Sequence, residues 1–241
     1  MKYCPLFMIA ALVALELAKA SSVKRPKCNN KIDLAIVIDA SASMGEENFA
    51  KSKAFARDLL SHFDISEEAT HVSLSYFSFY THLVTAFDDE DSSVATMYKE
   101  LKKMRYEGSF TNLAKTATGL RYKVFSKDRG ARKGQKDSKM VAVFLSDGFE
   151  SMGPDEISFC ISELHNYGVE TFAGIVDGEN SNEGIDSLVS PEKKDHKFTM
   201  YNDPKKRKIE LERMVQSICK IYNKPKETIA DTNEAMEDGE Q

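Results

Sequence analysis

Residues 32–45 read IDLAIVIDASASMG, and the rest of the chain is arranged around them. The aliphatic run Leu34–Ile38 is bounded by turn-forming residues, and such a run is typical of a parallel strand covered on both faces. We expect it to be the central strand of a sheet. Asp39, Ser41 and Ser43 follow at alternate positions, at the end of the strand where open α/β sheets place their ligand sites.

The residue types at these three positions suit a hard cation. One carboxylate and two hydroxyl groups are oxygen ligands, the kind that Mg²⁺ takes in proteins. The hydroxyl groups add no negative charge, so a bound ion would keep a strong attraction for a further acidic ligand. Ser is also a favoured helix N-cap, and capping of the following helix is therefore the alternative role of Ser41 and Ser43.

Length and composition indicate one globular domain. The chain has 241 residues, of which 41% are hydrophobic and 29% are charged. This is enough for one core of ordinary size and too little for two large domains. The net charge of -5 is too small to indicate a nucleic-acid partner, and the five His residues lack the spacing of a zinc site.

The first twenty residues predict a secretory signal peptide. Lys2 precedes an apolar run from Leu6 to Leu15, and Ala18-Lys19-Ala20 has the small-x-small pattern of a cleavage site. The run is too short to span a bilayer, and no later stretch approaches about 18 uninterrupted apolar residues. We therefore expect a secreted, extracellular protein without a membrane span. The alternative is an N-terminal anchor that is never removed.

The sequence divides into four parts. After the signal peptide at residues 1–20, residues 21–31 form a polar lead-in, and the globular domain is expected at residues 32–222. Residues 223–241 carry six acidic and two basic residues with few apolar ones. This composition predicts a disordered acidic tail.

Removal of the signal peptide would leave three cysteines. Cys28 precedes the first strand and Cys219 lies near the end of the last expected helix, so an oxidised pair would join the two ends of the domain. Secretion is compatible with such a bond. Cys160 lies at helical spacing from Ile157 and Leu164, and we expect it to be a buried, unreactive thiol.

Strand and helix patterns alternate along the rest of the domain. Apolar strands are expected at Met140–Leu145 and Val169–Val176, and a short last strand at Phe198–Tyr201. Alternating residues at His71–Phe77 and His82–Phe87 predict a half-covered hairpin at the edge of the sheet. This order predicts an α/β, doubly wound fold, with a mostly parallel sheet, one antiparallel edge strand and helices on both faces.

Two further segments bring oxygen donors to the same edge of the predicted sheet. Thr111 lies in a loop before a helix, and Asp147 follows the strand Met140–Leu145 in the sequence Ser-Asp-Gly. The carboxyl ends of parallel strands meet at one edge, so these side chains should lie near Asp39. Each also has a simpler interpretation, because Thr111 could cap its helix and Asp147 could serve the turn before Gly148.

These five oxygen donors resemble the metal-ion-dependent adhesion site of the von Willebrand factor type A domain, which is called the I domain in integrins. They are Asp39, Ser41, Ser43, Thr111 and Asp147. The resemblance covers residues 32 to about 222 and implies a site for Mg²⁺, or for Mn²⁺ or Ca²⁺. It implies that the two Ser bind the ion directly, that the Thr joins when ligand is bound, and that the two Asp bind directly or through water. It also implies an end-to-end disulfide between Cys28 and Cys219.

The resemblance implies a secreted, non-enzymatic adhesion module. Its open metal position would take Asp or Glu from an extracellular matrix protein, for example collagen. The expected rim of the site is Glu46, Phe110, Phe149 and Glu150.

Other functions compete with this interpretation. One is a structural or mineral-associated matrix protein that acts through its acidic tail. Another is a Mg²⁺-dependent phosphohydrolase, which is less favoured because its acid/base Asp would be expected at position 41, where this chain has Ser. Residues 123–139 hold seven Lys or Arg against two Asp. We interpret them as a solvated loop, with weak polyanion binding as a minor hypothesis.

Overall fold

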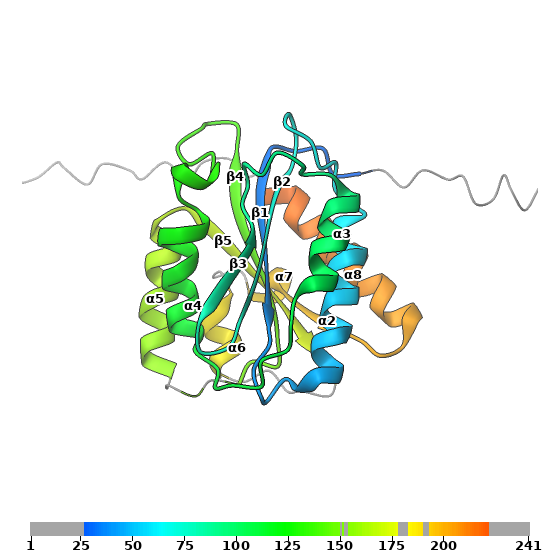
Figure 1. Cartoon of the computed structure of the whole chain (residues 1–241), viewed down its shortest axis with the longest axis vertical. Helices are drawn as coiled ribbons and strands as arrows, with labels where there is room; N and C mark the ends of the chain where they lie inside the picture. Colours follow the sequence, from blue (N-terminus) through cyan, green and yellow to red (C-terminus); the bar gives the residue numbers. More distant parts are fainter. Residues whose placement is uncertain (1–26, 150, 152–153, 178–182, 190–192, 222–241) are drawn as a thin grey trace, which may run out of the picture.

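The structure has the predicted α/β architecture. This computed structural model describes residues 27–149, 151, 154–177, 183–189 and 193–221. The expected signal peptide, most of the lead-in and the acidic tail lie outside the described residues. Within them, six strands form one sheet in the order β3-β2-β1-β4-β5-β6 (Figure 1). Only β2 and β3 pair antiparallel in this described sheet, which confirms the mostly parallel arrangement with one antiparallel edge strand.

The strands and helices alternate along the chain as the sequence predicts. The strands are β1 Ile32–Asp39, β2 His71–Phe77, β3 Thr81–Thr85, β4 Lys139–Ser146, β5 Val169–Val176 and β6 Lys197–Met200. The α-helices are α2 Gly45–Leu60, α3 Val94–Lys103, α4 Leu113–Gly119, α5 Pro154–Asn166, α6 Glu183–Leu188, α7 Lys193–His196 and α8 Pro204–Ile221. A π-helical turn, η1, extends α4 over Leu120–Val124, and a 3-10 turn, η2, covers Lys127–Arg129. None of the helices in these described segments is long and apolar enough to cross a bilayer.

β1 is the central strand, and its side chains face two separate cores. Leu34 and Ile36 pack in the core formed with α2, α3 and α8. Ala35 and Val37 pack in the core formed with α4, α5 and α6. Figure 1 shows these two groups of helices on opposite faces of the sheet. The continuous apolar run in β1 thus reflects burial on both faces.

The prediction of a half-covered β2 is wrong. β2 lies inside the sheet between β1 and β3, and Ser73 and Ser75 are fully buried. The hydroxyl of Ser73 donates a hydrogen bond of 2.7 Å to the carbonyl oxygen of Thr85. Because a hydroxyl can be buried when it has a partner, Ser73 does not mark a solvent-facing side of β2.

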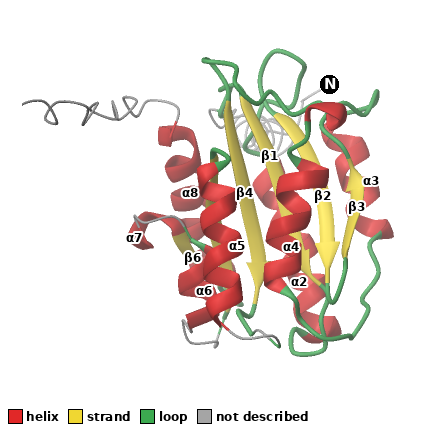
Figure 2. Ribbon diagram, turned by 90° about the vertical axis from the view of Figure 1, so that its left-hand side faces the viewer, coloured by secondary structure: helices red, strands yellow, loops and turns green. Residues whose placement is uncertain are grey.

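The carboxyl ends of the parallel strands lie together at one edge of the sheet, the lower edge in Figure 2. The loops that follow β1 and β4 leave the sheet at this edge. The opposite edge holds the two ends of the described domain. The oxygen donors and the chain ends are therefore separated by the length of the sheet.

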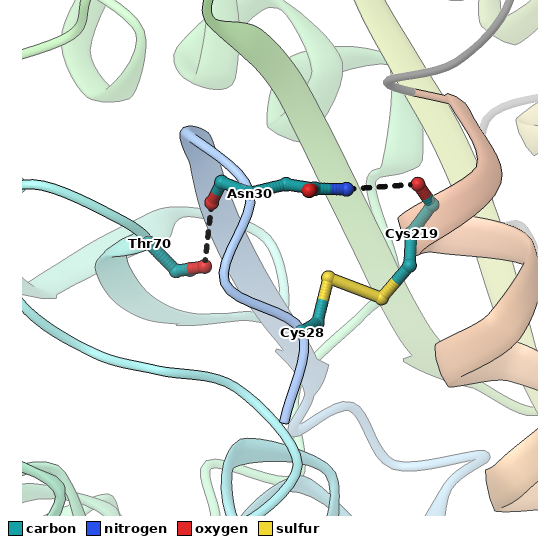
Figure 3. The surroundings of a disulfide bond; sticks show 4 residues. All are labelled: Cys28, Asn30, Thr70 and Cys219. Atoms are coloured by element: carbon teal, nitrogen blue, oxygen red, sulfur yellow. Dashed lines mark hydrogen bonds between the residues drawn. A yellow bond between two sulfur atoms is a disulfide. The ribbon is translucent and has the colours of Figure 1, made fainter. Parts of the chain in front are cut away.

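A disulfide joins the ends of the domain at the amino edge. Cys28 and Cys219 are bonded, with a sequence separation of 191 residues and Cα atoms 6.1 Å apart (Figure 3). Asn30 Nδ2 donates to the carbonyl oxygen of Cys219 at 2.9 Å and so ties the same two segments. In the chain-entropy model, closing a loop of this length stabilises the fold by about 5 kcal/mol.

Cys160 is less buried than predicted. Its side chain is partly exposed between α4 and α5, and its sulfur accepts a hydrogen bond from the hydroxyl of Thr118 at 3.5 Å. Its neighbours Ile157 and Ile161 are buried. The helical spacing identified the correct face of α5, but Cys160 lies at the margin of that face.

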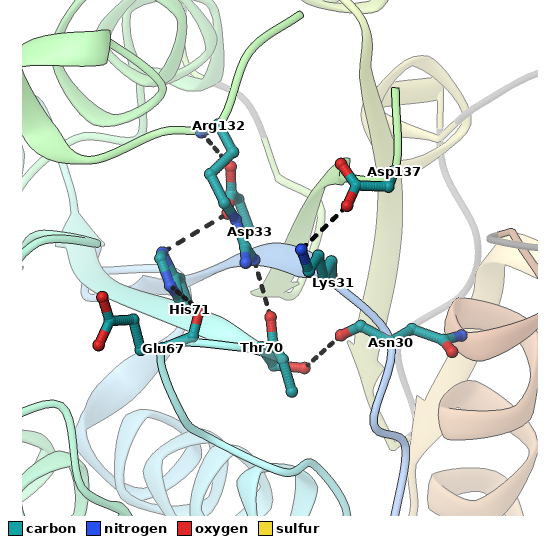
Figure 4. A network of polar contacts seen from close by, with 9 residues as sticks. Asn30, Lys31, Asp33, Glu67, Thr70, His71, Arg132 and Asp137 are labelled. Carbon is teal, nitrogen blue, oxygen red and sulfur yellow. Dashed lines mark hydrogen bonds and ion pairs between the residues drawn. The ribbon is translucent and has the colours of Figure 1, made fainter. Parts of the chain in front are cut away.

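A buried ion pair lies near the amino end of β1. Asp33 is fully buried, and its carboxylate accepts hydrogen bonds from Arg132 Nε at 2.7 Å and from the backbone N–H of Arg132 at 2.6 Å (Figure 4). The guanidinium also donates to the carbonyl oxygen of Ala69 at 2.9 Å. One of the seven cationic side chains in residues 123–139 is therefore used inside the fold.

We predict that Arg132→Ala lowers the free energy of unfolding by about 3–5 kcal/mol, because it leaves the carboxylate of Asp33 buried without its partner. Urea unfolding monitored by circular dichroism measures the change. Arg129→Ala, at an exposed position of the same loop, is the matched control and should change stability by no more than about 0.5 kcal/mol. Equal unfolding midpoints for the two variants would contradict the proposed importance of the pair.

Candidate metal centre

The candidate site is built around a buried carboxylate at the end of β1. Asp39 is fully buried, and its Oδ1 accepts a hydrogen bond of 2.9 Å from the backbone N–H of Ser41. Its Oδ2 accepts a hydrogen bond of 2.7 Å from the hydroxyl of Ser146, the last residue of the neighbouring strand β4. Both carboxylate oxygens are thus held by groups from two adjacent strand ends.

Burial makes the anionic form of Asp39 costly. Removal from water raises the pKa of Asp39 to about 6, although the hydrogen bonds from Ser41 and Ser146 act in the opposite direction. The negative charge of Asp147 raises the pKa of Asp39 further. A cation beside these two carboxylates would stabilise their charged forms, so the electrostatics of the site fit a metal ion.

Three hydroxyl groups form a short chain beside this carboxylate. The oxygens of Ser41 and Ser43 are 3.1 Å apart, and those of Ser43 and Thr111 are 3.5 Å apart. Ser41 and Thr111 are buried, whereas Ser43 is exposed. The cluster therefore opens to solvent at Ser43. Neutral hydroxyl oxygens next to carboxylates are the kind of donor set that a hard divalent cation takes.

Backbone hydrogen bonds explain why Thr111 lies beside Ser43, 68 residues earlier in the chain. The N–H of Gly108 donates a hydrogen bond of 3.0 Å to the carbonyl oxygen of Ala40. The N–H of Ala42 donates a hydrogen bond of 2.8 Å to the carbonyl oxygen of Ser109. Gly108 has a φ of +64°, which glycine adopts at little cost. These bonds join the loop before α4 to the loop after β1.

Asp147 follows directly from the end of β4. Its Oδ1 accepts a hydrogen bond of 3.0 Å from the backbone N–H of Phe149, and the N–H of Gly148 donates to the hydroxyl of Ser146 at 3.0 Å. The turn role that the sequence allowed for Asp147 is therefore present. Asp147 nevertheless lies close enough to Asp39 for its negative charge to raise the pKa of that carboxyl group.

The capping roles considered for the hydroxyl residues are wrong. The N-cap of α2 is Met44, which makes no side-chain capping bond, so neither Ser41 nor Ser43 caps this helix. The N-cap of α4 is Asn112, whose side-chain oxygen accepts from the N–H of Lys115 at 2.8 Å. The three hydroxyl groups are thus not used to cap these helices.

Sequence reasoning missed the roles of Ser146 and Ser151. Ser146 orients Asp39 across the β1–β4 pair, and Ser151 Oγ accepts from the N–H of Thr111 at 3.1 Å. The sequence did contain a signal for Ser146, because this residue stands at the end of a predicted strand, directly before Asp147. Its contact with Asp39 depends on the register that pairs Ile38 with Leu145, which the sequence does not show.

The expected rim residues that the structure describes are exposed to solvent. Phe110 is 73% exposed and Phe149 is 54% exposed, although both are large and apolar. Glu46 is also exposed, in the first turn of α2. Glu150 lies outside the described residues.

A model of the von Willebrand factor type A domain matches residues 33–212 of this chain. The chain belongs to the von Willebrand factor type A family. Its relatives include human von Willebrand factor A domain-containing protein 2, which is 29% identical over 175 residues, 72% of this chain and 22% of that protein. Mouse vitrin is 25% identical over 196 residues, 81% of this chain and 28% of that protein. Mouse matrilin-2 is 32% identical over 145 residues, 59% of this chain and 14% of that protein. In each case the match spans less than a third of the relative.

Solved structures support the type A fold. Proximal thread matrix protein 1 from the mussel byssus, in a structure described as having a zinc-occupied MIDAS motif, matches with a TM-score of 0.68 and 17% sequence identity. The match covers 81% of this chain and 50% of that one. At this identity the likeness shows the fold alone.

In this von Willebrand factor type A domain, we predict that Ser146→Ala lowers the free energy of unfolding by about 1.5–3 kcal/mol, because a buried carboxylate loses a hydrogen-bond donor. Urea unfolding at pH 7.5 in metal-free buffer measures the loss. Ser162→Ala, at an exposed position of α5, is the control and should change stability by no more than about 0.5 kcal/mol. Unchanged stability of the Ser146 variant would show that the bond to Asp39 is not needed.

Proposed function

We propose that this chain is a secreted, metal-dependent adhesion module of the extracellular matrix. Five side chains would hold one divalent cation, Mg²⁺ or in its place Mn²⁺ or Ca²⁺. They are Asp39, Ser41, Ser43, Thr111 and Asp147. One observation carries the proposal. Three hydroxyl groups that do not cap a helix converge beside the buried carboxylate of Asp39.

The chemistry of the donors favours an acidic ligand. When bound, the cation would supply a Lewis-acidic attachment point for a carboxylate. Three of the five donors are neutral, and Ser43 is exposed, so the cluster is accessible to an Asp or Glu side chain of another protein. The zinc-occupied motif named for proximal thread matrix protein 1 supports a divalent ion in this family.

Two features support an extracellular place for this module. The apolar leader at residues 1–20 has the pattern of a secretory signal, and the bond between Cys28 and Cys219 suits an oxidising compartment. The similarity to matrilin-2 favours a matrix protein as the partner. Collagen is the first candidate to test.

The alternative functions receive less support. Asp39 is buried with both oxygens accepting hydrogen bonds, and residue 41 is Ser, so no observation favours a phosphohydrolase. Arg132 forms an ion pair with Asp33, so its charge is not available for the polyanion binding considered for residues 123–139. The hypothesis of a structural or mineral-associated role depends on the acidic tail, residues 223–241, which lies outside the described part of the chain.

We predict that the purified chain takes up one Mn²⁺ or Mg²⁺ per molecule in isothermal titration calorimetry. Ser43→Ala and Thr111→Val should each weaken this uptake at least tenfold, since each removes one donor oxygen and a change in a supporting residue alone often costs about 10–100-fold. Ser43 is exposed, so its variant should remain folded. Ser162→Ala on α5 is the control and should bind like the parent chain. No heat of binding with either ion would overturn the proposal.

We predict that adhesion to a matrix protein depends on the ion. The parent chain is applied to immobilised collagens and other matrix proteins in Mg²⁺ and, separately, in EDTA. Binding should disappear in EDTA and with Ser43→Ala, because the partner's carboxylate would lose its attachment point. Binding that survives EDTA but is lost when residues 223–241 are deleted would instead assign the function to the acidic tail.

A further inference from the structure

The last helix of the described domain, α8, ends at the amino edge of the sheet, beside a hollow. The hollow has a volume of about 410 Å³ and is formed by residues 27–30 and by the end of α8. Lys27 and Lys220 are among its lining residues, and both are exposed. The chain that follows Ile221 therefore begins next to two positive charges.

A second group of positive charges lies in the loop before β4. Residues 127–136, the basic loop, contain five Lys or Arg and one Asp. Arg132 is paired with Asp33 inside the fold, whereas Lys127, Arg129 and Lys136 are exposed. The basic loop thus presents an excess of positive charge to solvent.

Three contacts place the basic loop next to the end of α8. Asn30 Nδ2 donates a hydrogen bond of 2.9 Å to the carbonyl oxygen of Cys219 (Figure 3). Lys31 Nζ forms an ion pair of 2.9 Å with Asp137, which directly follows the basic loop (Figure 4). The carbonyl oxygen of Lys31 accepts a hydrogen bond of 3.1 Å from the N–H of Lys139. Because consecutive Cα atoms are about 3.8 Å apart, the end of α8 and the end of the basic loop lie at adjoining parts of the amino edge.

The sequence that continues from α8 has the opposite charge. Its acidic residues are Glu227, Asp231, Glu234, Glu237, Asp238 and Glu240, and its basic residues are Lys224 and Lys226. The segment from Ile221 to Glu227 can span at most roughly 20 Å. Covalent attachment gives such a segment a local concentration on the order of 1 mM at a surface within its reach. The acidic tail is therefore a polyanion tethered beside a cationic surface.

We propose that the acidic tail, residues 223–241, binds the amino-edge cations of its own chain. These cations are Lys27, Lys127, Arg129, Lys136 and Lys220. The bound tail covers a surface that would otherwise take another polyanion, such as a sulfated polysaccharide. The inference is independent of the proposed metal centre, which lies at the opposite edge of the sheet.

A second cationic segment of α8 provides the contrast. Lys205, Lys206 and Lys208 are exposed in the first turns of this helix. The helix has 18 residues, so these turns lie on the order of 25 Å from its end. The acidic residues of the tail meet the amino-edge cations before they can reach the start of α8.

The first test measures binding of a fluorescent heparin oligosaccharide by anisotropy, at about 0.15 M ionic strength and with EDTA present. The parent is the chain without residues 1–20. One variant ends at Tyr222, and a second keeps the full length but has the six acidic tail residues replaced by Gln or Asn. Both should bind at least about fivefold more tightly than the parent, because the tethered tail no longer competes. Equal affinity of all three chains, or a gain on truncation alone, would overturn the proposal.

Lysine variants locate the contact. Lys127→Gln combined with Lys136→Gln should remove most of the gain that truncation gives. The control, Lys205→Gln combined with Lys208→Gln, removes the same charge from the start of α8 and should keep the gain. All four side chains are exposed, so the variants should fold, and urea unfolding checks this. Loss of the gain in the control, or its retention in the loop variant, would overturn the assignment.

Amide chemical shifts report the contact without the oligosaccharide. Deletion of the tail should shift the amide signals of the basic loop and leave those at the start of α8 unchanged. The shift differences should shrink at high salt, because salt screens exposed charges. Unshifted signals in the basic loop would overturn the proposal. Differences that grow with protein concentration would assign the tail to a second copy and would overturn binding within one chain.

Discussion

The buried carboxylate of Asp39 is the constraint on which the candidate site depends. A carboxylate without solvent must be held by hydrogen bonds or by a cation, and here one oxygen is held from the loop after β1 and the other from the end of β4. This requirement couples the positions of two strand ends. Any movement of β4 relative to β1 would separate Ser146 from Asp39 and raise the cost of the buried charge.

The interactions at the amino and carboxyl ends of the parallel strands have different effects on the fold. At the amino edge, the bond between Cys28 and Cys219 and the pair between Asp33 and Arg132 fasten the chain ends and one long loop. At the carboxyl edge, backbone hydrogen bonds hold the loop before α4 against the loop after β1. The proposed binding surface therefore lies on loops, but these loops are supported by a rigid sheet.

Much of the fold could be predicted because its signals are local. The apolar runs of β1, β4 and β5 and the helical periodicity of α2 and α8 depend on residues near one another in the chain. The errors arose where burial was decided by distant partners. Ser73 can be buried because the carbonyl oxygen of Thr85 accepts a hydrogen bond from its hydroxyl group, and Cys160 is partly exposed because it lies at the margin of the packed face of α5.

The candidate site was also partly predictable. The pattern from Asp39 to Ser43 and the strand-end Asp147 predicted oxygen donors at one edge of the sheet, and the structure brings the hydroxyl oxygens of Ser43 and Thr111 to 3.5 Å from each other. The supporting role of Ser146 could not be predicted, because it depends on the β1–β4 register.

By itself, the sequence determined the order of strands and helices and the chemistry of the oxygen donors. Periodicity and residue type express these properties within short segments. Only the tertiary structure decided that the hydroxyl groups are not helix caps and that both carboxylate oxygens of Asp39 are held by hydrogen bonds. The physical reason is that these features are made by strand register and by hydrogen bonds between distant segments, and neither leaves a pattern in the local sequence.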